Sequence, residues 1–130
     1  MDPMRLVQVA QRAVDLDRAT AFYADLLGGE PLATYDPPGL VFFDLDGTRL
    51  LVDRNAPAGL IYLSVDDIHA TVERLRAKGV HIESEPHVIF SHADSTLGPA
   101  GTDEWHAFIR DSEDNIVGLI EQRLAAARHM

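Results

Sequence analysis

The sequence predicts an α+β fold in which two βαβββ modules pair into cupped mixed sheets around a shared cleft, with the helices on the outside. Three observations predict it. An apolar strand pattern leads into an amphipathic helix near the N-terminus, and three strand patterns follow that helix. The same order of elements returns after the Pro/Gly break at residues 56–59. Each unit is too short to close a hydrophobic core alone, so we expect one domain over residues 1–130.

The first module covers about residues 5–55 and begins with an apolar stretch, residues 5–14, that predicts a strand. Asp15 or Asp17 can cap the helix that follows. The residues spaced to face the core along one helical stripe are Leu16, Ala19, Phe22, Tyr23, Leu26 and Leu27. Two glycines then end the helix, and the dipeptide Asp46-Gly47 predicts a tight hairpin between the last two strands of the module.

The second module covers about residues 59–123 and repeats this order. Its helix is expected to turn Ile68, Val72 and Leu75 inward and to end at Gly79. Strand patterns occur at residues 60–65, 80–90, 104–110 and 115–122. The segment 91–103 has no such pattern, and a loop of that length in a compact domain is usually functional or disordered.

The composition narrows the partners and the chemistry. The net charge is −10, because 21 acidic residues stand against 11 Lys and Arg residues, so nucleic acids and membrane surfaces are poor partners. The chain has no cysteine, which excludes disulfides and thiol nucleophiles and fits a cytoplasmic protein. No apolar run reaches the length of about 18 residues that a membrane-spanning helix needs, so we expect none.

Three stretches combine a helix cap, an amphipathic helix or a closing hairpin in a characteristic way: VDLDRATAFYADLLGG in the first module, and IYLSVDDIHATVERLRAKGV and EWHAFIRDSEDNIVGLIEQ in the second. They resemble the vicinal oxygen chelate superfamily, which includes glyoxalase I, extradiol dioxygenases and bleomycin resistance proteins. The resemblance covers nearly all of residues 5–123. It is specific for the fold and unspecific for the reaction, because this scaffold hosts unrelated chemistries.

The resemblance implies four metal-ligand positions, one in the first strand and one in the last strand of each module. Counting from the aspartates that open the helices, and from the final strands, places Gln8, Leu51, Leu60 and Gly118 there. Leucine and glycine side chains have no lone pairs, and one amide oxygen cannot replace the hydration of a divalent cation. We therefore expect no metal at the family positions and no cofactor, with a divalent metal at a different site as an open alternative.

Strand parity predicts which side chains line the cleft. Arg12 and Arg49 share parity with Gln8 and Leu51, and an arginine there suits a carboxylate or phosphate on a ligand, although pairing with an acid such as Asp53 is equally compatible. Apolar and aromatic residues complete the lining and suit an organic ligand. The predicted ligand-binding residues are Gln8, Arg12, Phe42, Arg49, Leu51, Leu60, Tyr62, His106 and Phe108.

Histidines gather around the segment that interrupts the repeat. Alternation along residues 105–110 places Trp105, Ala107 and Ile109 on one face, so His106, Phe108 and Arg110 lie on the other, toward the cleft. His92 and His106 are the catalytic candidates. With His87, Asp94 and Gln8 they could form a relocated metal site or an acid–base pair. The alternative is that these histidines only bond backbone or water around an irregular loop.

Two functions follow from these features. The first is binding or sequestration of a small, partly aromatic molecule by a homodimer, as the bleomycin-resistance branch of the resemblance implies. The second is a lyase, isomerase or oxygenase that uses a relocated metal or histidine acid–base chemistry around His92 and His106. A regulatory domain with a collapsed cleft is a weaker third hypothesis.

Overall fold

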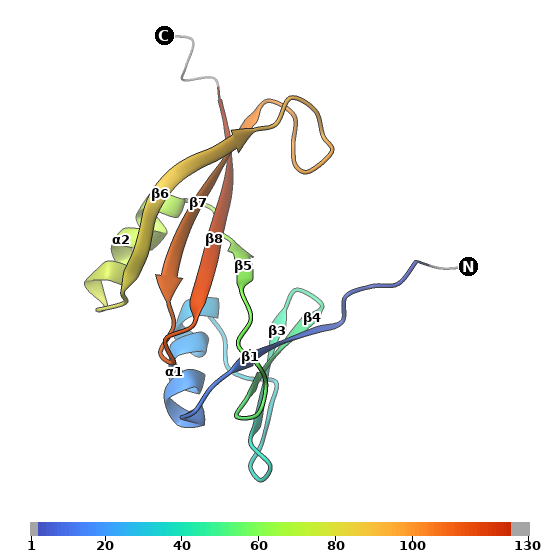
Figure 1. Ribbon diagram of the computed structural model, residues 1–130, viewed down its shortest axis with the longest axis vertical. Helices are drawn as coiled ribbons and strands as arrows, with labels where there is room; N and C mark the ends of the chain where they lie inside the picture. The colour runs from blue at the N-terminus through green and yellow to red at the C-terminus, as the bar shows by residue number, and fades with distance from the viewer. Residues whose placement is uncertain (1–2, 126–130) are drawn as a thin grey trace. The chain divides into compact units, whose positions relative to one another are not determined.

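The structure is a computed structural model that describes residues 3–125, and the chain divides into two compact units (Figure 1). The first comprises the chain up to Gly59 together with Asp111–Asn115, and the second comprises Leu60–Arg110 and the chain from Ile116 onward. Each unit holds one helix and one four-stranded mixed sheet. The predicted α+β class and the repeated βαβββ order are therefore confirmed.

The two units share one strand topology. The elements of the first are β1 (Gln8–Arg12), α1 (Leu16–Leu27), β2 (Ala33–Tyr35), β3 (Leu40–Leu45) and β4 (Thr48–Asp53). Those of the second are β5 (Ile61–Ser64), α2 (Ile68–Ala77), β6 (Ile82–Ser91), β7 (Thr102–Arg110) and β8 (Ile116–Leu124). The sheet orders are β1-β4-β3-β2 and β5-β8-β7-β6, with β1–β4 and β5–β8 parallel and the other pairs antiparallel.

Strand β1 is shorter than the predicted stretch 5–14. Its ladder with β4 runs from Gln8 opposite Arg49 to Arg12 opposite Asp53. The chain must then turn so that Asp15 can cap α1, where its carboxylate accepts the Arg18 N–H at 3.0 Å. The apolar composition of residues 5–7 and 13–14 thus overstated the strand, because the partner strand and the helix cap set its ends.

Helix α1 buries a narrower stripe than predicted. Leu16, Ala19 and Tyr23 are buried, whereas Phe22, Leu26 and Leu27 are only half-buried. The fully covered residues of the sheet that complete this core are Val41, Phe43, Leu50 and Val52. They alternate along β3 and β4, so one face of the sheet carries the core and the opposite face stays open.

The predicted hairpin turn, the buried residues of α2 and the end of this helix are confirmed. Asp46 and Gly47 both have positive φ, at 52° and 97°, which is the two-residue turn that joins β3 to β4. In the second unit Ile68, Val72 and Leu75 are buried as predicted, and Gly79 has a φ of 85° just beyond α2. The alternation along β7 is also confirmed, because Ala107 and Ile109 are fully buried while His106 and Phe108 lie on the other face.

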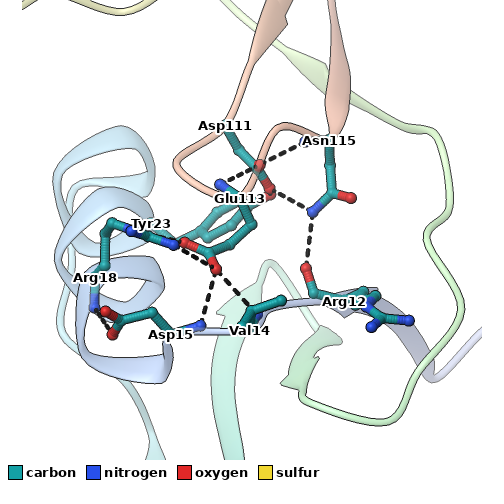
Figure 2. A network of polar contacts seen from close by, with 8 residues as sticks. All are labelled: Arg12, Val14, Asp15, Arg18, Tyr23, Asp111, Glu113 and Asn115. Atoms are coloured by element: carbon teal, nitrogen blue, oxygen red, sulfur yellow. Dashed lines mark hydrogen bonds and ion pairs between the residues drawn. The ribbon is translucent and has the colours of Figure 1, made fainter.

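The turn between β7 and β8 belongs to the first unit and is tied there by a polar network (Figure 2). One Glu113 oxygen accepts the backbone N–H groups of Val14 and Asp15 at 2.9 Å each, and its other oxygen accepts Arg18 Nε at 2.7 Å. Asp111 accepts the Tyr23 hydroxyl at 2.6 Å. These contacts hold the start of α1 and explain why a polar turn is buried.

None of the helices within residues 3–125 combines the length and the apolar character that crossing a membrane requires.

Candidate functional site

The register of the second sheet brings the chemically interesting residues to the face opposite the buried core. Tyr62 lies beside Gly118, which lies opposite Phe108 on β7. One step further along, Ser64 lies beside Ile120, which is opposite His106. Gln122 is opposite Glu104. We call this surface the open face of the second sheet.

Three rings form a cluster on the open face. The Tyr62 ring lies 5.9 Å from Phe108 and 5.7 Å from His106, and the His106 and Phe108 rings are 6.3 Å apart. Gly118 makes this packing possible, because a Cβ atom there would lie 2.5 Å from the Tyr62 ring. The side chain of Tyr62 fills the space beside Gly118 and stays 48% exposed, so it offers an aromatic surface to a ligand.

Glu104 is the centre of a polar cluster on the same face. Its Oε1 pairs with His92 Nε2 at 2.8 Å and accepts Gln122 Nε2 at 3.3 Å, while its Oε2 pairs with His106 Nε2 at 2.7 Å. The side chains of His92, Glu104 and His106 are 2%, 10% and 13% exposed. We call Glu104, His92, His106 and Gln122 the Glu104 cluster. Its carboxylate is almost withdrawn from water and is held on both oxygens.

The environment keeps this carboxylate ionised. Burial raises the pKa of Glu104, but the hydrogen bonds from His106, His92 and Gln122 outweigh it, so the pKa lies below the ordinary value. An ionised carboxylate has only lone pairs to offer, so the two imidazoles donate their Nε2 hydrogens to it. The cluster therefore fixes the tautomer as well as the orientation of both rings.

The loop of residues 92–101 encloses one side of this cluster. It closes through the Gly101 N–H, which donates to His92 O at 2.9 Å, and the His92 N–H, which donates to Thr102 O at 2.8 Å. A Cβ atom on Gly98 would lie 2.6 Å from Gln122 Nε2 and 2.9 Å from His92 Cε1. The segment without periodicity is thus an ordered cover, and its glycine allows the backbone to approach the cluster.

A hollow of about 420 Å³ lies next to the cluster. Its lining comes from β5, β8 and the turn after β5, and consists of Tyr62, Ser64, Val65, Asp66, Ile120, Glu121 and Gln122. Ile120 and Gln122 are the cross-strand neighbours of His106 and Glu104, so the hollow adjoins the imidazole and carboxylate groups. Its volume is in the range of sites for small organic molecules.

The predicted histidine group is partly corrected. His92 and His106 do come together, and the residue that joins them is Glu104 rather than Asp94. Asp94 is exposed and accepts the Thr96 N–H at 3.0 Å, as a turn-forming aspartate does. His87 lies opposite His106 on β6, is exposed, and its Nδ1 bonds Glu85 O at 2.8 Å. For His87, the alternative of a histidine bonded to backbone therefore fits.

The predicted residues of the first module share the open face of the first sheet. Arg49 Nε donates to Gln8 Oε1 at 3.0 Å, and the guanidinium lies 5.7 Å from the centre of the Phe42 ring. Leu51 lies opposite Phe42 and beside Ala10. The alternative pairing of Arg49 with Asp53 is not what the structure shows, because Asp53 accepts the Asn55 N–H instead.

Two other predicted residues are exposed. The Arg12 side chain is open to water, and its backbone carbonyl accepts Asn115 Nδ2 at 2.7 Å. Leu60 directly precedes β5 and is 51% exposed. Whether these residues touch a ligand stays a prediction.

The donors at the four family positions do not fit a divalent cation. Gln8 has the single side-chain oxygen of the set, and the positively charged Arg49 already donates to it. At Gly118 the adjacent space is filled by the Tyr62 ring. Hard cations need several oxygen or nitrogen donors, which Leu51 and Leu60 lack as well.

One further group of possible ligand atoms lies on the helix side of the second sheet. Asp67, His69 and Glu121 bring a ligand atom each within 4.8 Å of one another. Arg123 donates to Glu121 at 2.9 Å and lies 3.7 Å from Asp67, and its Nη2 is 3.3 Å from His69 Nδ1. Glu121 also accepts the Ile68 N–H at 2.8 Å. A guanidinium thus already occupies the space among these ligand atoms and offsets one of the two carboxylate charges, and the Ile68 contact holds the start of α2.

Glu104 and Gln122 were missed in the sequence, although one signal points to the first of them. Glu104 and His106 are two residues apart on one strand, and that spacing places both side chains on the same face. His92 gives no such signal, because it lies outside the strands and reaches Glu104 only through the path of the loop.

Comparison with known proteins places these features in a family. Residues 5–111 match the Glyoxalase/Bleomycin resistance protein/Dioxygenase superfamily. A lactoylglutathione lyase structure from Agrobacterium tumefaciens is similar with 25% identity and a TM-score of 0.68, over 93% of this chain and 96% of that one. A glyoxalase/bleomycin resistance protein/dioxygenase structure from Alicyclobacillus acidocaldarius has 18% identity and a TM-score of 0.64, over 99% and 98%.

An integron cassette protein structure from V. cholerae has 15% identity and a TM-score of 0.69, over 92% of this chain and 96% of that one. Comparison with curated proteins gives no match. The likenesses at 18% and 15% identity show the fold alone.

Proposed function

The chain belongs to the Glyoxalase/Bleomycin resistance protein/Dioxygenase superfamily, and we propose that it binds a small planar organic molecule without a metal at the family positions. The ligand lies on the open face of the second sheet. The observation that carries this proposal is the hollow of about 420 Å³ lined by Tyr62, whose ring packs against the rings of His106 and Phe108. Binding and sequestration, as in the bleomycin-resistance branch, are the function that this arrangement supports best.

The residues that line the hollow favour an aromatic ligand. Tyr62 offers an exposed ring face, and Ile120 adds an aliphatic surface next to it. Ser64 and Gln122 supply a hydroxyl and an amide as polar anchors. Sites of this kind bind through burial and stacking, and a few polar groups fix the orientation of the ligand.

Electrostatics favours a neutral or cationic ligand over an anionic one. The chain has a net charge of −10, and the hollow is lined by two carboxylates, Asp66 and Glu121. Arg123 compensates Glu121, and Asp66 is exposed beside the hollow. An anionic group would therefore meet an unfavourable potential.

The second candidate function is enzymatic: a lyase, isomerase or oxygenase with its chemistry around His92 and His106. Of its two forms, the Glu104 cluster favours acid–base chemistry over a relocated metal. Each imidazole Nε2 is engaged by a different oxygen of Glu104, at 2.8 and 2.7 Å, so the nitrogens do not converge on one free point. The similar structure titled lactoylglutathione lyase lends this candidate a precedent within the fold.

Calorimetric titration with three probes of one size tests the binding proposal: neutral 2-naphthol, cationic N-methylquinolinium and anionic 2-naphthalenesulfonate. We expect measurable binding of the first two and weaker binding of the third. Tyr62→Ala and Phe108→Ala should each weaken the binding of 2-naphthol by about 3- to 10-fold, which corresponds to the stacking energy of one ring.

Tyr35→Ala is the matched control, because Tyr35 is a similarly exposed aromatic residue, at 55%, on the sheet of the first unit. It should leave the affinity unchanged. Absence of binding for all three probes in the wild-type protein, or equal losses in Tyr35→Ala and Tyr62→Ala, would contradict the proposal.

The remaining parts of the proposal concern partners and location. We propose a homodimer that binds a small molecule, as the bleomycin-resistance branch of the family implies. We further propose that it acts in the cytoplasm without a role for nucleic acid or membrane surfaces, on the grounds of the missing cysteines and the net charge of −10. Sedimentation at micromolar concentration tests the oligomeric state.

A further inference from the structure

His106 presents one nitrogen that the protein itself does not use. Its Nε2 is bound to Glu104 at 2.7 Å, and among residues 3–125 its Nδ1 has no hydrogen-bond partner. Because Glu104 fixes the hydrogen on Nε2, the Nδ1 of the neutral ring carries a lone pair. His106 is a proton acceptor whose tautomer is set in advance.

The position of this ring is suited to a ligand. His106 lies on the open face, 13% exposed in its side chain, packed against both the Tyr62 and Phe108 rings and opposite Ile120 of the hollow. His92, the other imidazole on Glu104, is only 2% exposed in its side chain and packs against the Phe90 ring at 4.8 Å. The two histidines therefore differ in accessibility: the His106 ring is partly exposed on the open face, whereas the His92 ring is buried against Phe90.

We propose that Nδ1 of His106 accepts the hydrogen of a planar aromatic ligand that carries a weakly acidic hydroxyl or ring N–H, with Glu104 as the positioning residue. This inference rests on the proposed function, because it concerns a ligand in the same hollow. It adds the chemical class of the ligand and the atom that selects it.

The proton movement is balanced within the pair. The ligand O–H or N–H bond breaks, its electrons stay on the ligand, and the hydrogen forms a bond to Nδ1. The resulting imidazolium donates from Nε2 to the Glu104 carboxylate, and the ligand anion pairs with the imidazolium. No oxidant, reductant or further reactant takes part.

The groups around His106 support this assignment. Its titratable neighbours are Glu104 on the same strand, His87 opposite on β6 and Tyr62 on β5, while β8 contributes the apolar Ile120. Glu104 is the one anion of this set at hydrogen-bond distance, and its lowered pKa keeps its charge available for an imidazolium. A carboxylate that orients an imidazole and stabilises its charged form is the arrangement used for proton transfer in hydrolytic triads.

The test compares two probes that differ in one hydrogen: 4-nitrophenol, and its methyl ether 4-nitroanisole. The wild-type protein should bind 4-nitrophenol about tenfold more tightly, which is the effect of one hydrogen bond to a group that becomes charged. Binding should also increase the yellow phenolate absorption at constant pH. His106→Phe keeps a ring against Tyr62 and Phe108 but removes Nδ1, so both the preference and the absorption change should disappear.

Glu104→Gln tests whether Glu104 positions and charges the His106 ring or only stabilises the fold. It should reduce the phenolate absorption of the bound probe, because the neutral amide supports an imidazolium poorly, while 4-nitroanisole binds as to the wild-type protein. His87→Gln is the matched control, because His87 is exposed opposite His106 and bonds backbone. His87→Gln should bind 4-nitrophenol more tightly than 4-nitroanisole by the same factor as the wild-type protein.

The outcomes are distinguishable. Equal affinity for both probes in the wild-type protein, or an unchanged preference in His106→Phe, would overturn the role of His106 and leave the binding function standing. Failure of both probes and of 2-naphthol to bind would overturn the proposed function itself.

Discussion

Two carboxylates at opposite ends of strand β7, Glu104 at its beginning and Glu113 just beyond its end, are both withdrawn from water yet are satisfied by different donors. Glu113 accepts two backbone N–H groups and the Arg18 guanidinium in the first unit. Glu104 accepts two imidazoles and an amide in the second unit. The Arg18 side chain keeps its charge over the whole physiological range, whereas an imidazole exchanges protons near neutral pH.

The difference separates a structural site from a chemical one. Backbone amides and a guanidinium have no second proton-accepting atom, so the Glu113 network can only hold the turn against α1 (Figure 2). An imidazole bound at Nε2 keeps Nδ1 for another partner. The Glu104 cluster therefore combines a fixed geometry with an unused proton acceptor, and the following changes should affect the two sites differently.

Asp111→Ala should have the largest effect on stability. The Asp111 side chain accepts the Tyr23 hydroxyl, the Glu113 and Asn115 N–H groups, and Asn115 Nδ2, at 2.6 to 3.0 Å. Its removal leaves these donors buried without an acceptor, so the free energy of unfolding should fall by about 3 kcal/mol. Urea unfolding measures it. Asp17→Ala, an exposed aspartate in the first turn of α1, should cost about 0.5 kcal/mol.

Equal losses for Asp111→Ala and Asp17→Ala would show that the turn network contributes little. The preference for 4-nitrophenol should survive Asp111→Ala at a temperature where the variant is folded, because the network lies in the other unit.

Glu113→Gln should reduce stability next most strongly, in a pH-dependent way. The hydrogen bonds from Arg18, opposed by burial and aided by the Asp15 N–H, lower the pKa of Glu113 from 4.5 to about 2. A lowered folded-state pKa contributes stability above the unfolded value, and this contribution is lost as the pH falls from about 5 toward 2. Glu113→Gln should lower the free energy of unfolding by about 2 kcal/mol at neutral pH, and this free energy should then depend less on pH below about 5.

Unfolding curves between pH 7 and about pH 2 check this expectation. Glu30→Gln, at an exposed position, should leave the curve as in the wild-type protein. If the stability of Glu113→Gln fell at low pH as much as that of the wild-type protein, the Glu113 carboxylate would not be the group whose protonation causes the fall. If Glu113→Gln also lost the preference for 4-nitrophenol over 4-nitroanisole, Glu113 and Glu104 would not differ in role as we propose.

Gly118→Ala should act on the ligand site with a smaller effect of about 1 kcal/mol. The added methyl group would meet the Tyr62 ring at 2.5 Å, so the ring must move away from Phe108 and the affinity for 2-naphthol should fall about fivefold. Calorimetry measures it. Gly29→Ala, where a Cβ meets nothing within 4 Å, is the matched control.

The same substitution in a Tyr62→Ala background should have no further effect, because the clash partner is gone. If the two substitutions reduced the affinity for 2-naphthol additively, Gly118→Ala would not act through the Tyr62 ring.

Divalent cations should have the smallest effect. The donors at the family positions do not fit a cation, and the Nε2 atoms of His92 and His106 are bound to different oxygens of the Glu104 carboxylate. Addition of Mn²⁺, Ni²⁺, Zn²⁺ or Fe²⁺ should therefore change the Tm by less than about 1 °C. Thermal unfolding with and without chelator checks this. A rise of several degrees that disappears in Glu104→Gln would assign a metal to the cluster and reverse our interpretation.

The sequence was most informative where structure depends on neighbours along the chain. The caps at Asp15 and Asp67, the turn at Asp46-Gly47 and the inward residues of α2 were predicted correctly, because capping and turn conformations are local. The opposite faces of His106 and Ala107 follow from the alternation of any strand. The buried stripe of α1 was predicted too wide, since the strands that cover a helix, β3 and β4 for α1, are distant in sequence and are not encoded in its own periodicity.

Which side chains meet was decided by the tertiary structure. His92 reaches Glu104 because β6 and β7 pair, through several register shifts, up to Ser91 opposite Asp103. The loop of residues 92–101 then folds back, and Gly98 lets it approach the cluster. Glu113 reaches the start of α1 from almost a hundred residues away. The sequence by itself determined the repeated βαβββ order and the faces of the strands, because periodicity encodes them. The site depends on register and loop path, which arise only when distant segments pack together.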